Sequence, residues 1–241
     1  METKTAIGNT DITRPCIYIV PTPIGNLEDI TFRAIRILQE ADVIAAEDTR
    51  VTQHLLKHYA IPTPMISIHG HNEHKKVPQI LQDVLDKKLI LAVVSDAGTP
   101  GISDPGFLII REAILKNIPI TCLPGPTALI PALVMSGFPC DRFVYEGFLP
   151  AKKGRKKRIE QLKHEHRTIV LYESVHRIFQ TLQDLSEELG KDCPAAICRE
   201  ISKKFEQVLR GTLEDLTSLN QHKIAEKGEF VIILTPQPKT S

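Results

Sequence analysis

A loop of twelve residues, 95–106, constrains the fold and function of this chain more than any other segment. It reads Ser-Asp-Ala-Gly-Thr-Pro-Gly-Ile-Ser-Asp-Pro-Gly and follows the apolar run 89–94, which is typical of a strand buried on both faces. Its glycines and prolines exclude a regular element. Loops between strands and helices usually have about 2–6 residues, so a plain connector is the weaker explanation. Ligands of open α/β sheets bind beside the carboxyl ends of strands, so we expect this loop, with Asp96 and Asp104, to bind one.

Apolar runs alternate with amphipathic segments along the first half of the chain. This alternation predicts a mostly parallel sheet with helices on both faces. Asp29 and Asn72 are the expected N-caps of two helices, and Pro105 is expected in the first turn of another. The expected strands are 16–20, 43–46, 65–68, 89–94 and 118–122. The expected helices are 30–39, 49–58, 73–87 and 105–115.

The segment 123–128, Leu-Pro-Gly-Pro-Thr-Ala, is the expected domain junction, with Thr127 as the cap of the next helix. It divides the chain into an N-terminal extension 1–15, an α/β domain 16–124 and an α+β domain 125–241. The second domain has more strands than helices, which predicts a mixed sheet. Its expected strands are 142–146, 167–172, 195–201, 205–211 and 229–234, the third and fourth forming an antiparallel pair. Its expected helices are a basic one between the first two strands, 175–189 ended by Gly190, and 213–221.

Composition excludes several classes of protein. Hydrophobic residues make up 42% and charged residues 24% of the 241 residues, as in ordinary globular proteins. The formal net charge of +1 means that any attraction to nucleic acid is local. No apolar run approaches the roughly 20 residues of a membrane-spanning helix, and residues 1–14 lack the apolar core of a secretory signal. We therefore expect a cytoplasmic protein without a membrane partner.

Cysteine and histidine patterns do not predict a metal site. The five cysteines are widely spaced and include no Cys-x-x-Cys pair, so buried free thiols explain them better. His69, His71 and His74 lie near Glu73, but their spacing matches neither a His-Glu-x-x-His helix nor a zinc finger. The chain also contains neither the dinucleotide-binding motif Gly-x-Gly-x-x-Gly nor the phosphate-binding motif Gly-x-x-x-x-Gly-Lys-Ser/Thr. Kinases, GTPases and nicotinamide dehydrogenases are therefore disfavoured, and we expect a ligand without a pyrophosphate.

Nine short motifs carry a resemblance to a known family. They follow one another in order at 21–31, 46–50, 69–73, 95–106, 123–128, 145–150, 172–177, 199–201 and 227–230. Together they resemble the ribosomal RNA small subunit methyltransferase I family, within the tetrapyrrole methylase-like (class III) S-adenosylmethionine methyltransferases. Val175 departs from the family pattern, which has proline there.

The resemblance implies two α/β domains with S-adenosylmethionine in the cleft between them, and a homodimer. It implies methylation of the ribose 2′-hydroxyl of a cytidine in the decoding region of 16S ribosomal RNA. The same fold and cofactor acting on a tetrapyrrole or a protein acceptor is one alternative, and a non-catalytic ribosome-associated module is another. The residues implied for the cofactor are Ile24, Ser95, Asp96, Ala97, Gly98, Ile102, Thr127, Ala128, Leu149, Tyr172, Gly228 and Glu229.

A basic run, 152–158, places six cations in seven residues. On a chain of nearly zero net charge, this asymmetry favours contact with the RNA backbone over a solvated helix end. The predicted RNA-binding residues are Lys152, Lys153, Arg155, Lys156, Lys157 and Arg158.

Transfer of a methyl group to a ribose hydroxyl benefits from a general base, because the hydroxyl is a poor nucleophile at neutral pH. Polar residues in the family-like motifs supply candidates between which the sequence does not choose. The candidates are Asp48, His71, Glu73, Glu173 and Glu200. Glu47, Asp48 and Arg50 fit a structural group of ion pairs at a helix start equally well.

Overall fold

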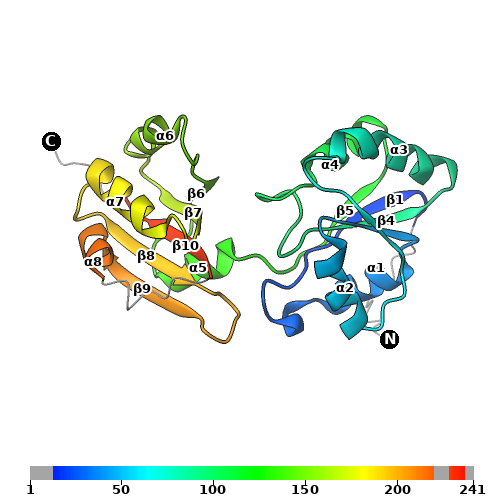
Figure 1. Cartoon of the computed structure of the whole chain (residues 1–241), viewed down its shortest axis with the longest axis horizontal. Coiled ribbons are helices and arrows are strands. Elements are labelled where there is room, and N and C mark those ends of the chain that lie inside the picture. The colour runs from blue at the N-terminus through cyan, green and yellow to red at the C-terminus, as the bar shows by residue number, and fades with distance from the viewer. Residues whose placement is uncertain (1–12, 220–227, 237–241) are drawn as a thin grey trace, which may run out of the picture. The chain divides into compact units, whose positions relative to one another are not determined.

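The computed structural model describes residues 13–219 and 228–236, which fold into two compact units (Figure 1). The first unit comprises 13–22 and 30–125, and the second comprises 23–29 and the described residues from 126 onward. The division expected from the sequence assigned 23–29 to the first domain and is wrong there. Local packing explains the difference: the Ser202 hydroxyl donates to the Asp29 carboxylate within the second unit. The first twelve residues of the expected N-terminal extension lie outside the described residues.

The first unit contains a five-stranded sheet in which all pairs are parallel. Its order is β3 (Met65–Ser67), β2 (Val43–Ala46), β4 (Ile90–Val94), β1 (Cys16–Ile19) and β5 (Ile120–Cys122). In the register, Ala46 of β2 lies beside Val94 of β4. The loops that follow β2 and β4 therefore start next to each other at the carboxyl edge of the sheet.

Two helices cover each face of this sheet, as predicted (Figure 1). Helices α1 (Phe32–Glu40) and α2 (Thr49–His58) pack on one face, and α3 (Glu73–Asp86) and α4 (Phe107–Leu115) pack on the other. Alternate residues along each strand enter the two apolar layers. For example, Ala92 of β4 packs with α1 and α2, whereas its neighbour Leu91 packs with α3 and α4. Burial on both sides explains why these strands are continuous apolar runs in the sequence.

Helices α1 and α4 begin later than the sequence predicts. Thr31, and not Asp29, is the N-cap of α1, because its hydroxyl accepts the N–H of Ala34 at 3.0 Å. Helix α4 begins at Phe107 because Gly106 has φ 133, a conformation that a helix cannot continue through. Pro105 therefore lies outside the helix.

Asn72 precedes α3 as predicted, but it does not cap that helix through its side chain. Its Oδ1 accepts the backbone N–H of His69 at 3.0 Å instead. This bond closes the turn that leads from β3 into α3.

The second unit contains a mixed five-stranded sheet, as predicted. Its order is β6 (Phe143–Phe148), β7 (Thr168–Ser174), β10 (Glu229–Leu234), β8 (Pro194–Arg199) and β9 (Gln207–Thr212). Only β6 and β7 pair in parallel, and the predicted antiparallel pair corresponds to β8 and β9. Strand β10 lies at the centre and consists almost wholly of buried apolar residues.

Helices also cover both faces of the second sheet (Figure 1). Helix α5 (Leu129–Ser136) packs on one face, and α6 (Arg155–Leu162), α7 (Ile178–Leu189) and α8 (Leu213–Ser218) pack on the other. Among the described residues, no helix combines the length and the apolar character needed to cross a membrane.

Three helix boundaries in the second unit differ from the prediction. Ala128, and not Thr127, is the N-cap position of α5, and it makes no side-chain capping bond. Helix α7 starts at Ile178 and not at Val175, because the residues before it form a turn. Helix α8 ends at Ser218, and the last two residues of the predicted helix lie outside the described residues. Gly190 ends α7 as predicted, with φ 102.

Candidate functional site

The loop after β4 is shaped by a backbone pair with the segment after β1. The N–H of Thr22 donates to the carbonyl of Gly98 at 2.9 Å, and the N–H of Gly98 donates back to the carbonyl of Thr22 at 2.9 Å. Gly98 has φ 76, in the left-handed region that favours glycine. The N–H and the carbonyl of Gly98 are therefore both used in hydrogen bonds within the protein. The predicted ligand would lie against this glycine without a hydrogen bond from its N–H.

Ser95 also stabilises the loop from within. The residue is buried, with only 1% of its surface exposed. Its hydroxyl donates to the carbonyl of Ala97 at 3.2 Å, and its own carbonyl accepts the hydroxyl of Thr22 at 3.0 Å. The serine thus sets the course of the chain, and Asp96 beside it is exposed.

The second part of the loop folds back on itself through two glycines. The N–H of Gly101 donates to the carbonyl of Pro105 at 3.2 Å. A Cβ on Gly106 would lie 3.2 Å from the Gly101 nitrogen, which leaves little room for a side chain. Ile102 lies on this turn with 39% of its surface exposed, so its apolar side chain is available for contact.

Three carboxylates lie close together where β2 and β4 end. Oδ1 of Asp96 accepts the N–H of Asp48 at 3.0 Å, and the N–H of Asp96 points to Oε2 of Glu47 at 3.4 Å. Burial raises the pKa of Glu47, and the neighbouring charges of Asp96 and Asp48 raise it further. From the sequence, Asp96 was predicted to contact the cofactor and Asp48 was a candidate general base. Glu47 was placed only in a structural group of ion pairs at the helix start. The position of Glu47, directly after β2 and beside the end of β4, is the sequence signal that could have identified it as a site residue.

Asp48 is occupied as the N-cap of α2. Its carboxylate accepts the N–H of Arg50 at 2.8 Å and also pairs with the Arg50 guanidinium. The side-chain hydrogen bond from Arg50 is the main reason that the pKa of Asp48 is lowered to about 2. A carboxylate with so low a pKa is a weak base, so the geometry favours the structural alternative for Asp48.

His71 and Glu73 lie at the start of α3. His71 is exposed, and its ring meets the ring of His69 edge-on with the centroids 6.0 Å apart. Nε2 of His69 is itself 2.8 Å from Nδ2 of Asn72. Within the described parts of the chain, no group of three or more His, Cys, Asp or Glu side chains is arranged to bind a metal ion.

In the second unit, Tyr172 belongs to an aromatic cluster. Its ring packs edge-on against Tyr145, with centroids 5.2 Å apart, and against Phe148, with centroids 5.7 Å apart. Phe148 is 49% exposed, so the cluster reaches the surface. Leu149 points into the core instead and is only 2% exposed. Of these two predicted cofactor residues, Tyr172 is the better placed to contact a ring from solvent.

The other predicted cofactor residues of this unit lie on three segments. Ile24 and Ala128 are half-buried against the core layer that includes α5, and Thr127 is half-buried directly before Ala128. Gly228 and Glu229 form the start of β10.

Glu173 is fully engaged in a buried network. Its side chain is 0% exposed and pairs with Nη2 of Arg177 at 2.9 Å. It also accepts the hydroxyl of Thr181 at 2.7 Å and the N–H of Ser174 at 2.7 Å. This burial and these three partners disfavour the predicted role of Glu173 as a general base.

The basic run divides into two kinds of residue. Arg155 is only 13% exposed at its side chain, where it pairs with Asp184 at 2.8 Å and donates to the Thr181 hydroxyl at 2.8 Å. Arg158 pairs with the nearly buried carboxylate of Glu146. Arg155 therefore stabilises α6 against α7, which disfavours its predicted role as an RNA-binding residue. Arg158 keeps 47% of its side chain exposed, and its contact with RNA stays a prediction.

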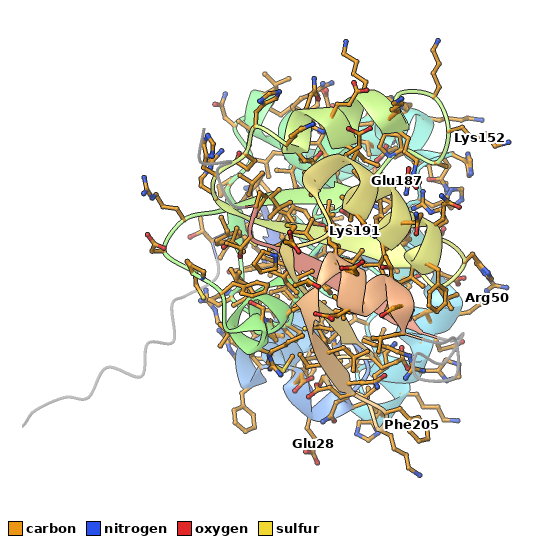
Figure 2. All side chains as sticks on the ribbon, turned by 90° about the vertical axis from the view of Figure 1, so that its left-hand side faces the viewer. Glu28, Arg50, Lys152, Glu187, Lys191 and Phe205 are labelled. Carbon is orange, nitrogen blue, oxygen red and sulfur yellow. The ribbon has the colours of Figure 1, made fainter. Side chains whose placement is uncertain are left out.

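The four lysines of the run differ from the two arginines. All are exposed, and in the described residues none of them forms an ion pair: Lys152, Lys153, Lys156 and Lys157. Lys152 is labelled at the surface in Figure 2, in the loop that precedes α6. Lysine therefore supplies most of the positive charge of this surface, and the half-exposed Arg158 adds to it.

Comparison with known sequences identifies relatives along nearly the whole chain. The tetrapyrrole (corrin/porphyrin) methylase family matches residues 16–217. The ribosomal RNA small subunit methyltransferase I of Xylella fastidiosa (strain Temecula1) is 48% identical over 220 residues, which cover 90% of this chain and 80% of that protein. The protein of the same name from Haemophilus influenzae is 45% identical over 233 residues, covering 96% of this chain and 82% of that protein.

Solved structures of low sequence identity share the fold. A diphthine synthase superposes with a TM-score of 0.70 at 14% identity, covering 91% of this chain and 90% of that one. A uroporphyrin-III-C-methyltransferase from Thermus thermophilus superposes with a TM-score of 0.64 at 18% identity, covering 92% and 95%. These two likenesses confirm the predicted pair of α/β domains.

Proposed function

This chain belongs to the ribosomal RNA small subunit methyltransferase I family of tetrapyrrole-type methylases, and we propose that it methylates the ribose 2′-hydroxyl of a cytidine in the decoding region of 16S ribosomal RNA. The observation that carries the proposal is the identity of 45–48% to proteins of that name across at least 90% of the chain. Such a substrate lies in the cytoplasm, which is the location that we propose. A homodimer, as implied by the resemblance, is part of the same proposal.

The first unit offers groups that suit S-adenosylmethionine. This cofactor carries a sulfonium, an ammonium and a carboxylate, and it supplies an activated methyl group. The exposed carboxylate of Asp96 complements the cationic groups, and Gly98 allows close approach because it has no side chain. The exposed side chain of Ile102 offers apolar contact.

The second unit offers a surface for a flat ring. The cluster of Tyr145, Phe148 and Tyr172 presents aromatic edges and faces near solvent, which suits an adenine. The other cofactor residues that the resemblance implies are part of the proposal on that ground alone.

Positioning of the hydroxyl is the larger part of the proposed catalysis, because methyl transfer needs the acceptor oxygen in line with the breaking bond. Removal of the hydroxyl proton then requires a base. Glu47 joins His71 and Glu73 as a candidate, since its raised pKa makes it a better proton acceptor than Asp48. Glu47 also lies beside Asp96, the proposed contact of the cofactor.

The four exposed lysines around the start of α6 supply the proposed RNA-binding surface. Lysine ammonium groups attract phosphates without reading the bases. The protein has few aromatic residues, 5% of the chain, so we propose that the shape of the ribosomal particle contributes much of the specificity.

A tetrapyrrole acceptor is the alternative suggested by the fold. The solved structures that carry tetrapyrrole names are under 25% identical, however, and share only the fold. A non-catalytic ribosome-associated module is the second alternative, and the intact glycine loop disfavours it.

Incubation with methyl-labelled S-adenosylmethionine tests the proposal. Purified protein is mixed separately with small ribosomal subunits, naked 16S RNA or uroporphyrinogen. We expect label in the RNA as 2′-O-methylcytidine. Label only on a base, a protein or the tetrapyrrole would overturn the acceptor, and cofactor binding without any transfer would favour the non-catalytic module.

A further inference from the structure

Lys203 joins three segments of the second unit that are far apart in the sequence. Its Nζ donates to Oε1 of Glu200 at 3.0 Å and to Oε2 of Glu229 at 3.0 Å. Oε1 of Glu200 also accepts the N–H of Glu229 at 3.1 Å. The methylene stem of Lys203 lies directly against Gly25. One lysine thus contacts the turn after β1, the loop after β8 and the start of β10.

Two glycines are required by the side chains of this cluster. A Cβ on Gly228 would lie 2.6 Å from Oε1 of Glu200, and φ is 111 at this glycine. A Cβ on Gly25 would overlap the Lys203 stem, with φ 147. The Glu200 side chain therefore occupies the space where a side chain at position 228 would lie. The Lys203 stem does the same at position 25.

The loop after β8 adopts a strained backbone to make these contacts. Glu200 has φ 52 and Ser202 has φ 65, both in the left-handed region that non-glycine residues rarely occupy. The Ser202 N–H is bound by Oε2 of Glu206 at 2.7 Å, and its hydroxyl donates to Asp29. Figure 2 labels Glu28 and Phe205, which directly precede Asp29 and Glu206 in the chain. Strain of this kind persists where the surrounding structure over-determines it, and functional sites are common examples.

The Glu200–Lys203 pair is sheltered from solvent. The side chains are 16% and 27% exposed, whereas the Glu229 side chain is 75% exposed. Burial acts to raise the pKa of Glu200, but the hydrogen bond from Lys203 and the Glu229 N–H outweigh it, so the pKa is lowered. Glu200 is therefore a charged partner of Lys203, which disfavours its predicted role as a general base.

We infer that Glu200 and Lys203 are positioning residues for the cofactor, because they join the turn that carries Ile24 to the strand start that carries Gly228 and Glu229. Those three residues are cofactor contacts in the proposed function, on which this inference rests. The pair sets their relative positions before the cofactor arrives, and pre-arranged contacts bind more tightly because less ordering is needed on binding.

Lys203→Met tests the inference, because methionine retains much of the apolar stem beside Gly25 and loses the ammonium. We expect affinity for S-adenosylmethionine, measured by titration calorimetry, to fall roughly tenfold, as for loss of a charged hydrogen bond. Lys203→Arg should recover most of that affinity. Lys204→Met is the matched control, since Lys204 is the exposed neighbour whose Nζ lies over the Phe205 ring at 5.7 Å, and it should bind the cofactor normally.

Glu200→Gln separates positioning from catalysis. Glutamine keeps an acceptor for the Glu229 N–H, so we expect a higher KM for the cofactor and a nearly unchanged kcat at saturation. A loss of kcat of about 100-fold or more at saturating cofactor would instead identify a general base and overturn the inference. This variant also serves if Lys203→Met does not fold, as judged by its thermal melt.

The wild-type measurement distinguishes the two proposals. Absence of cofactor binding by the wild type would overturn the proposed function. Normal binding by the wild type and equally tight binding by folded Lys203→Met would leave the proposed function standing and overturn the positioning role.

Discussion

Thr22 and Gly98 exchange two backbone hydrogen bonds, each 2.9 Å long, although 75 residues separate them in the chain. The pair ties the segment after β1 to the loop after β4. These two segments carry the first and the fourth of the family-like motifs. Because the exchange uses the backbone of Gly98 completely, the ligand-binding capacity of the loop depends on its shape and on its exposed side chains.

Gly98→Val is expected to abolish binding of S-adenosylmethionine without unfolding the protein. The φ of 76 costs a β-branched residue about 1–2 kcal/mol, and the new side chain would occupy the proposed approach of the cofactor. Calorimetry measures the binding and chemical denaturation measures the stability.

The matched control for this substitution is Gly137→Val. Gly137 also has φ 76, at the end of α5, and has open space around it. It should lose a similar stability and still bind the cofactor. Unchanged affinity in Gly98→Val would mean that the cofactor does not lie against this loop.

Replacing the four lysines of the basic run with alanine is expected to weaken RNA binding and leave cofactor affinity near that of the wild type. Each lost phosphate contact lowers the slope of log affinity against log salt by about 0.7–0.9. Some of the four need not touch phosphate, so we expect a combined drop of roughly 1–3. Binding of 16S RNA over a range of salt concentrations measures the slope, and an unchanged slope would place the RNA surface elsewhere.

Arg155→Ala is expected to destabilise the second unit instead. It removes a partly buried ion pair with Asp184 and a hydrogen bond to Thr181, which together contribute about 2–3 kcal/mol to the free energy of unfolding. Lys156→Ala, one residue further along α6, should change that free energy by less than about 0.5 kcal/mol. Urea denaturation compares them, and equal stability of the two variants would contradict the structural role of Arg155.

Asp48→Asn should flatten the dependence of stability on acid pH. The hydrogen bonds from Arg50 lower the pKa of Asp48 from 3.8 to about 2 in the folded protein. The stabilisation is therefore fully present above pH 3.8 and is lost as the pH falls toward 2. Unfolding measured between pH 5 and pH 2 should show a smaller decline for Asp48→Asn. An identical decline would mean that Arg50 does not hold this carboxylate in its charged form.

Much of the fold follows from local patterns in the sequence. Strand β4 was predictable because burial on both faces requires an uninterrupted apolar run, and β10 was predictable for the same reason. Helix starts were less predictable, because Asp29, Thr31 and the proline-glycine pair at 105–106 all suit a helix start. Tertiary contacts select among such neighbours.

The candidate site was predictable where it depends on position along a strand, and less so where it depends on distant partners. Asp96 follows directly from the end of β4. The roles of Arg155 and Glu173 depend on Asp184 and Thr181 of α7 and on Arg177, the residue before that helix. No local pattern distinguishes a paired arginine from an exposed one. Similarly, nothing near Gly25 in the sequence indicates that Lys203 will lie against it.

The segment 23–29 has a consequence for the order in which the protein is made. Its partners Ser202 and Lys203 are encoded more than 170 residues later. At about 5–20 residues per second of synthesis, those partners emerge from the ribosome roughly 9–35 seconds after the segment does. The first parallel sheet can form while the segment waits as an unpaired loop between β1 and α1. The second unit therefore gains these contacts only after Lys203 has been translated, and a nascent chain stalled before Lys203 would leave this early segment without them.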